Sequence, residues 1–161
     1  MKIWTTVLVC LLMVLAVHVD PLLSLDREKE FELIGKMTLR ELTPRAKAVL
    51  EKKYPGEKWE TYNFPKYVYI SDTVLTGYKI AVKQPQLLAK FPCYCFCEQT
   101  MNHKNLAYCF LKTGSFLGNF DDHGSNCNIC NGEAMMVFLW DQLGVTVPRM
   151  QQAVKKIFGP Q

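Results

Sequence analysis

The sequence predicts a mainly α-helical protein: a small single helical domain with a cysteine-rich loop region and room for one short β-hairpin. Three observations lead to this prediction. Apolar residues recur at helical spacing in several separate stretches. Proline and glycine residues mark the ends of these stretches. The chain of 161 residues is also long enough for one domain to bury a core of its own.

The first part of the mature chain is expected to be helical and then irregular. Residues 26–54 carry apolar side chains at roughly helical spacing. Thr43 is expected to cap a second helix that starts at Pro44, because proline favours the first helical position. This helix is expected to stop after Tyr54, and the aromatic stretch 58–71 is expected to be an extended connector over the core.

The second part is expected to contain four more helical segments. A helical pattern covers residues 72–83, and a further turn starts at Pro85. Two closing helices are predicted over 133–143 and 148–158, separated by Gly144.

The stretch between these segments is ambiguous. Residues 107–111 and 115–120 flank a Lys-Thr-Gly turn and fit a small hairpin, but a helix over 102–112 fits nearly as well.

Residues 1–19 are predicted to be a signal peptide or an N-terminal anchor. Lys2 precedes an apolar run that ends at Val17, and cleavage after Ala16 fits the residues there. Cys10 follows Val9, so no lipid attachment motif is present. We therefore expect an extracytoplasmic protein, in the periplasm or on the outer face of the cytoplasmic membrane, which touches the membrane only through this segment if it is not cleaved. The expected organisation is a targeting segment over 1–19, a helical arm and aromatic connector over 20–71, and a Cys/His-rich domain over 72–161.

The charge pattern argues against nucleic acid as a partner. The 19 Lys and Arg residues and 15 Asp and Glu residues give a net charge of +4, and the basic residues form no stripe. No Ser-His-Asp arrangement, glycine-rich phosphate loop or positioned carboxylate pair stands out. A binding role is therefore favoured over an enzymatic one.

Six of the seven cysteines lie between residues 93 and 130. The run Pro92-Cys93-Tyr94-Cys95-Phe96-Cys97 places three thiols at every second residue. In an extended chain these thiols would share one face with Cα atoms about 6.6 Å apart, the upper limit for a relaxed disulfide. A metal ion bridges such thiols more easily, since each metal–sulfur bond is about 2.3 Å long.

The second cysteine segment is Cys127-Asn-Ile-Cys130, with His123 four residues ahead of Cys127. One loop can therefore deliver a histidine and two cysteines to a single ion. A c-type haem site is disfavoured because Asn131 stands where that motif needs histidine.

The combined donors exceed the four ligands of a structural zinc site, and soft thiolates select copper(I), zinc or iron–sulfur clusters. We expect copper(I), with zinc or an iron–sulfur cluster as alternatives, and as partners the metal ion and a metal-accepting or redox protein. The preferred ligands are Cys93, Cys95, Cys97, His123, Cys127 and Cys130, and the second choices are His103 and Cys109.

Two other functions stay open at this point. One is thiol–disulfide exchange through Cys127 and Cys130, whose place ahead of a predicted helix lowers thiol pKa values. The other is a disulfide-stapled interaction module, since six exported cysteines ordinarily form disulfides.

The order of these motifs resembles the PCYCGC-motif family of exported bacterial and archaeal proteins, which is similar to the CYCXC group. The likeness runs from about Tyr78 to Phe158. The family's function is unknown, so the resemblance implies export and cysteine use but no reaction. Phe96 stands where the family usually has glycine, and the lipid attachment motif of many members is missing.

Overall fold

The computed structural model describes residues 21–116 and 118–160. The expected targeting segment, residues 1–19, lies outside the described residues, and so does Cys10. No helix within the described ranges is both long and apolar enough to span a membrane. The chain divides after Glu30, and the compact unit from Phe31 onward holds the core and all six cysteines of the cluster.

The predicted mainly α class is confirmed, because the described part of the chain contains helices and no β-strand. Its elements are, in chain order, α2 (Pro21–Lys36), α3 (Leu39–Lys53), η2 (Trp59–Tyr62), η3 (Lys66–Ile70), α4 (Asp72–Lys83), α5 (Pro85–Leu88), α6 (Cys97–Met101), η4 (Leu106–Cys109), α7 (His123–Asn126), α8 (Asn128–Gln142) and α9 (Val147–Phe158). Those written η are 3₁₀ helices. The expected boundary at residue 71 between arm and domain stays a prediction.

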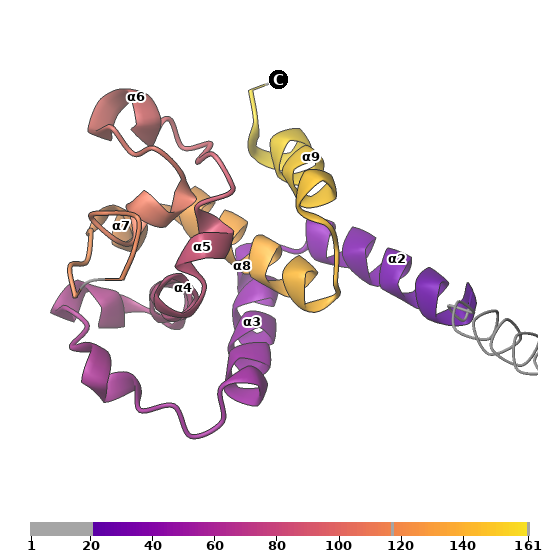
Figure 1. The fold of residues 1–161 in the computed structure, drawn as a ribbon, viewed down its shortest axis with the longest axis horizontal. Coiled ribbons are helices and arrows are strands. Elements are labelled where there is room, and N and C mark those ends of the chain that lie inside the picture. The colour runs from indigo at the N-terminus through magenta and orange to yellow at the C-terminus, as the bar shows by residue number, and fades with distance from the viewer. Residues whose placement is uncertain (1–20, 117, 161) are drawn as a thin grey trace, which may run out of the picture. The chain divides into compact units, whose positions relative to one another are not determined.

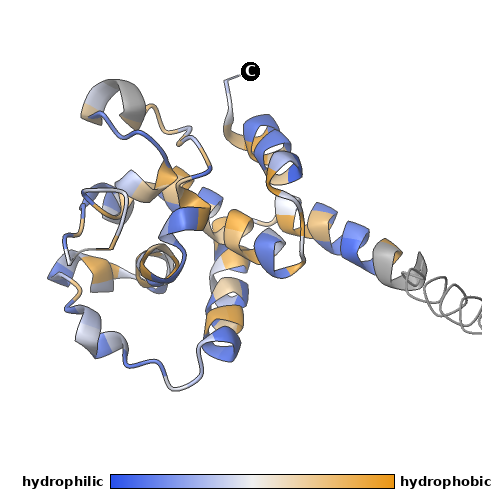
Figure 2. Ribbon diagram, in the orientation of Figure 1, coloured by the Kyte–Doolittle hydropathy of each residue, from blue (hydrophilic) through white to orange (hydrophobic). Residues whose placement is uncertain are grey.

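Helix α8 is the centre of the fold. It packs against α3, α4, α5 and α9 (Figure 1). Its residues from Cys130 to Trp140 are buried, as expected of a helix that is apolar on every side. Trp140 anchors its end: the indole Nε1 donates a hydrogen bond of 3.0 Å to the Phe31 carbonyl, and the two rings lie 4.9 Å apart. Hydrophobic residues concentrate on α4 and α8 (Figure 2).

The helix predicted to restart at Thr43 and Pro44 starts five residues earlier, so this prediction is wrong. Thr38 caps α3, and both its backbone N–H and its hydroxyl donate to the Glu41 carboxylate at 2.8 Å. This Thr-x-x-Glu capping box gives hydrogen-bond partners to backbone N–H groups at the start of the helix. A helix start at Thr43 would leave this pair of interactions unused. Pro44 lies inside α3, where it removes one backbone hydrogen bond of the helix.

The aromatic stretch expected to be extended instead forms η2 and η3. Tyr62 and Phe64 stack at 5.8 Å, and they pack on Phe116 and Phe120 at 5.1 and 5.2 Å respectively. The stretch therefore supports the loop that leads into Asp121 and α7.

Neither alternative for residues 102–120 is fully realised. The chain forms the short helix η4, turns at Gly114 with a φ of +68°, and makes a single antiparallel bridge between Leu111 and Phe120. The optional hairpin is reduced to this bridge. The Lys112 backbone N–H donates to the Asn119 carbonyl at 3.2 Å, but the described residues form no ladder of further strand pairs.

Candidate metal centre

The first cysteine run is a turn and is not extended. Phe96 has a left-handed φ of +64°, and helix α6 begins directly afterwards at Cys97. The turn brings the Cys93 and Cys95 sulfurs to 3.2 Å from each other, although alternate residues of a strand lie farther apart.

The second segment is held by α7 and the start of α8. The His123 backbone N–H donates to Asp121 Oδ1 at 2.9 Å, which fixes the first residue of α7. Cys127 is the N-cap of α8, and its sulfur accepts the Cys130 backbone N–H at 3.4 Å. Cys130 therefore lies in the first turn of the central helix, which starts at Asn128, five residues before the start predicted at residue 133.

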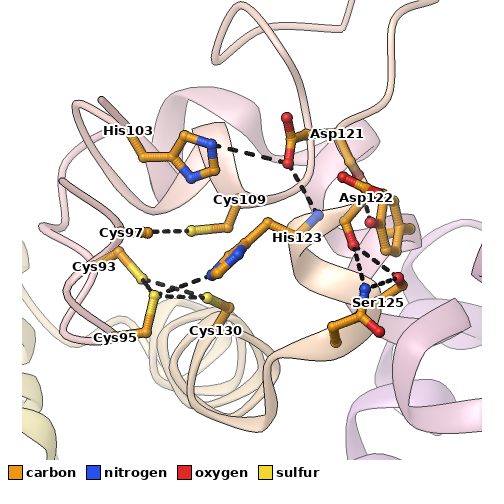
Figure 3. A network of polar contacts seen from close by, with 12 residues as sticks. Cys93, Cys95, Cys97, His103, Cys109, Asp121, Asp122, His123, Ser125 and Cys130 are labelled. Carbon is orange, nitrogen blue, oxygen red and sulfur yellow. Dashed lines mark hydrogen bonds and ion pairs between the residues drawn. The ribbon is translucent and has the colours of Figure 1, made fainter. Parts of the chain in front are cut away.

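The fold packs the two segments against each other (Figure 3). Cys130 Sγ lies 3.4 Å from Cys93 Sγ and 3.5 Å from Cys95 Sγ. His123 Nε2 points at Cys95 Sγ at 3.2 Å. On the other side of the run, Cys97 Sγ lies 3.5 Å from Cys109 Sγ, which η4 supplies.

These donors form two groups of four, and in each group the ligand atoms lie within 4.8 Å of one another. The first group consists of Cys93, Cys95, Cys97 and Cys109, and the second of Cys95, His123, Cys127 and Cys130. The cluster can therefore hold a metal ion. All six preferred residues and the second-choice Cys109 come together in these groups.

His103, the other second choice, lies beside the cluster. Its ring centre is 5.4 Å from that of His123, and its Nε2 lies 3.8 Å from Asp121 Oδ1 (Figure 3). It belongs to neither group of donors.

A family model described as a protein of unknown function with PCYCGC motif matches residues 59–156. The chain belongs to this family. The match starts before Tyr78, where the resemblance in the sequence begins, and so includes the aromatic stretch. Comparisons with curated proteins and with solved structures gave no match. The PCYCGC family thus establishes relationship but names no reaction.

The left-handed backbone of Phe96 explains the glycine in the family motif. Position 96 is the fifth of the PCYCGC pattern, and a φ of +64° suits glycine, which has no Cβ to clash. The Phe96 ring is 59% exposed, so little burial offsets this strain.

Replacing Phe96 by glycine is therefore expected to stabilise this PCYCGC protein by about 0.5–1 kcal/mol, because it removes the left-handed strain at the cost of some unfolded-chain entropy. Urea denaturation of the metal-free, reduced chain measures this. Asn102→Gly is the control: Asn102 has a φ of 57°, but asparagine tolerates this region and should gain less. An F96G variant less stable than wild type would contradict the assignment of strain.

The pKa values of the cluster's thiols shift in opposite directions. Hydrogen bonding from Cys130 is the leading cause that lowers the pKa of Cys95 to about 5, and those of Cys109 and Cys127 to about 6. The same neighbours, first Cys109, raise the pKa of Cys130, and burial raises that of Cys97. Cys130 has a single S–H and can donate to one of these sulfurs at a time, and a bound metal would displace the proton of every thiol that it ligates.

The imidazole of His123 responds to the same thiolates. Burial by itself lowers the pKa of His123, but the hydrogen bond and charge of Cys95 outweigh it and raise the pKa. His123 is thus an electrostatic partner of Cys95 in the metal-free state and a nitrogen donor when neutral.

Glu133 is a site residue that the sequence reasoning missed. It is fully buried in α8, and its Oε1 accepts the Tyr94 backbone N–H at 3.2 Å, which ties the cysteine turn to the central helix. Burial, followed by the charge on Cys93, raises the pKa of Glu133 to about 10. The sequence feature that could have pointed to Glu133 is a single carboxylate directly before the apolar run 134–140.

Replacing Glu133 by glutamine is expected to stabilise the metal-free chain by about 1–2 kcal/mol at pH 7. The folded pKa of about 10 exceeds the ordinary 4.5, so unfolding releases a proton between these values and stability falls as pH rises through this window. Glutamine resembles the neutral acid and does not titrate, although burying its amide offsets part of the gain. Denaturation of both chains at pH 5, 7 and 9 measures the difference, which should grow with pH.

Glu41→Gln serves as the control with the opposite sign. The Thr38 backbone N–H lowers the pKa of Glu41, so its carboxylate stabilises the fold above its ordinary pKa and glutamine should destabilise at pH 7. A pH-independent difference between wild type and Glu133→Gln would show that Glu133 is ionised in the folded chain.

Proposed function

We propose that this PCYCGC protein is an exported soft-metal-binding protein that holds copper(I) for transfer, storage or sensing. The observation that carries the proposal is the convergence of six thiols and one imidazole in a single cluster. Carboxylate oxygens are absent from both donor groups in the described residues, so the donor set is soft. Six thiols with only one imidazole make a sulfur-dominated set, which favours copper(I).

The distribution of burial supports exchange of the metal with another molecule. Cys93, Cys97, Cys109 and Cys130 are buried, whereas Cys95 and Cys127 are only half-buried. Phe96, which follows Cys95, and Ile129, two residues after Cys127, are exposed hydrophobic residues. A metal-accepting protein can therefore reach the half-buried thiols of Cys95 and Cys127 first.

Export is the second part of the proposal. The basic Lys2 and the apolar run before Asp20 motivate it, together with the resemblance to a family of exported proteins.

A thiol–disulfide function is the second candidate, and one observation favours it. Cys127 is the N-cap of α8, and hydrogen bonding from the Cys130 thiol, then from the Cys130 backbone, lowers the pKa of Cys127 to about 6. Such a thiolate is suited to attack a disulfide. By contrast, no sulfur pair of the described cysteines lies at the disulfide bond length of about 2.05 Å, so the structure gives no support to a disulfide-stapled module.

Titration of the reduced chain with copper(I) against a competing chelator, combined with thiol trapping, separates the two functions. If the cluster holds copper(I), Cys95→Ser and Cys130→Ser should each weaken binding by about tenfold or more, because each removes a soft ligand. His123→Asn should have a smaller effect. If the protein exchanges disulfides, Cys130→Ser should trap a mixed disulfide through Cys127, and Cys95→Ser should leave exchange intact.

The wild type decides between them. Tight copper(I) binding without a trapped partner supports the metal function. Absence of copper(I) affinity in the reduced wild type, together with a trapped partner in Cys130→Ser, overturns it in favour of exchange.

A further inference from the structure

We infer that the cluster is a binuclear centre in which the sulfur of Cys95 bridges two metal ions. This inference rests on the proposed metal-binding function and deepens it, because it fixes how many ions the chain holds and which donor joins them.

The first step is the geometry of the two donor groups. Tetrahedral coordination with bonds of about 2.3 Å places neighbouring donors about 3.8 Å apart. In both groups the donors already lie within 4.8 Å of one another, so each can close around an ion with small side-chain movements. Each group alone has the four ligands of a closed site.

The second step is the use of every donor. A single tetrahedral ion takes four ligands and would leave three donors of the cluster idle. Two groups of four that share Cys95 contain seven donors, which are the six thiols and His123. Two ions therefore use each of these donors, whereas His103 belongs to neither shell.

The third step is the position of Cys95 between the groups. Its sulfur lies 3.2 Å from Cys93 Sγ in the first group and 3.2 Å from His123 Nε2 in the second. Cys93 and Cys130, from opposite groups, also approach to 3.4 Å. The two sites thus adjoin at Cys95 (Figure 3).

The fourth step is charge. Ligation requires the six thiols to lose their protons, and the resulting thiolates, gathered largely away from water, would repel one another unless cations offset their charge. Two cations offset twice as much of this charge as one. Buried Glu133 belongs to neither donor group, so the thiolates are the negative charges that the ions must neutralise.

Metal counting on the reduced chain under anaerobic conditions tests the inference. Native mass spectrometry with copper(I) should show two ions per chain. Cobalt(II) serves as a magnetic probe of the bridge: the chain loaded with two cobalt(II) ions should lose most of its electron paramagnetic resonance signal per ion, because a shared thiolate couples the two spins. His103→Asn is the matched control for His123→Asn and should keep two ions and the coupled signal.

Substitutions that touch one group only should remove one ion only. Cys109→Ser affects the first group and Cys127→Ser the second, so each should retain a single ion with an uncoupled cobalt(II) signal. Cys95→Ser leaves three donors in each group and should lose the coupling. Circular dichroism checks that each variant folds, and if Cys95→Ser does not, the Cys109 and Cys127 variants and the wild-type coupling still decide.

The outcomes separate this inference from the proposed function. A wild-type chain that binds one copper(I) ion, or three or more, overturns the binuclear centre and leaves soft-metal binding in place. Two ions with independent cobalt(II) spins overturn the Cys95 bridge. A reduced chain that binds no copper(I) overturns the proposed function itself.

Discussion

Loading the reduced chain with copper(I) is expected to raise its free energy of unfolding by about 4 kcal/mol for each ion, at free metal a thousandfold above the dissociation constant. The reason is linkage: the complete cluster exists only when α6, η4, α7 and α8 are in place, so the ion binds the folded chain more tightly than the unfolded one. In a domain of this size the melting temperature should rise by roughly 15 °C for each ion.

Scanning calorimetry of the metal-free and loaded chains, without oxygen, measures the shift. The metal-free chain should still melt cooperatively, because its apolar core runs from Phe31 to Val154 and does not depend on the metal. Cys95→Ser is the control and should show a much smaller shift. An unchanged melting temperature at saturating copper(I) would mean that the metal binds without using the folded cluster.

Replacing Gly124 by alanine is expected to destabilise the metal-free chain by about 3–4 kcal/mol. A Cβ at this position would lie 2.6 Å from Phe110 Cδ1 and 2.9 Å from the Cys109 carbonyl oxygen. Phe110 is fully buried and the carbonyl is backbone, so neither can move without disturbing the core. Since α7 must then shift, His123, the first residue of this helix, should move away from Cys95. The copper(I) affinity should fall as well.

Gly132→Ala is the matched control for this substitution. Its Cβ would approach the Leu39 and Phe158 side chains at 3.3 and 3.4 Å, and alanine favours the helix, so the change should stay within about 1 kcal/mol. Urea denaturation of both variants measures stability, and copper(I) titration measures affinity. Equal stability of the two variants would contradict the close packing of α7 on η4.

Local features were read well from the sequence. The helix over 72–83 was predicted with its observed bounds and the turn at Pro85 with its observed start, because capping residues and apolar periodicity act over a few neighbours. The start of α3 was missed because two local signals competed. The capping box of Thr38 and Glu41 prevailed over the Thr-Pro pair, since it satisfies more backbone and side-chain groups.

The sequence by itself determined the candidate donor residues, the PCYCGC relationship and the mainly helical class, because these depend on residue identity and short-range pattern. Only the tertiary structure decided how the donors are grouped. Cys109 joins Cys97 because η4 packs on α5 and α8, and Cys95 meets both His123 and Cys130 because the left-handed Phe96 turns the run towards α8. Cys93 and Cys130, whose sulfurs also meet, lie 37 residues apart in the chain. At such a separation the packing of the core, and not local backbone preference, sets the distance between two sulfurs.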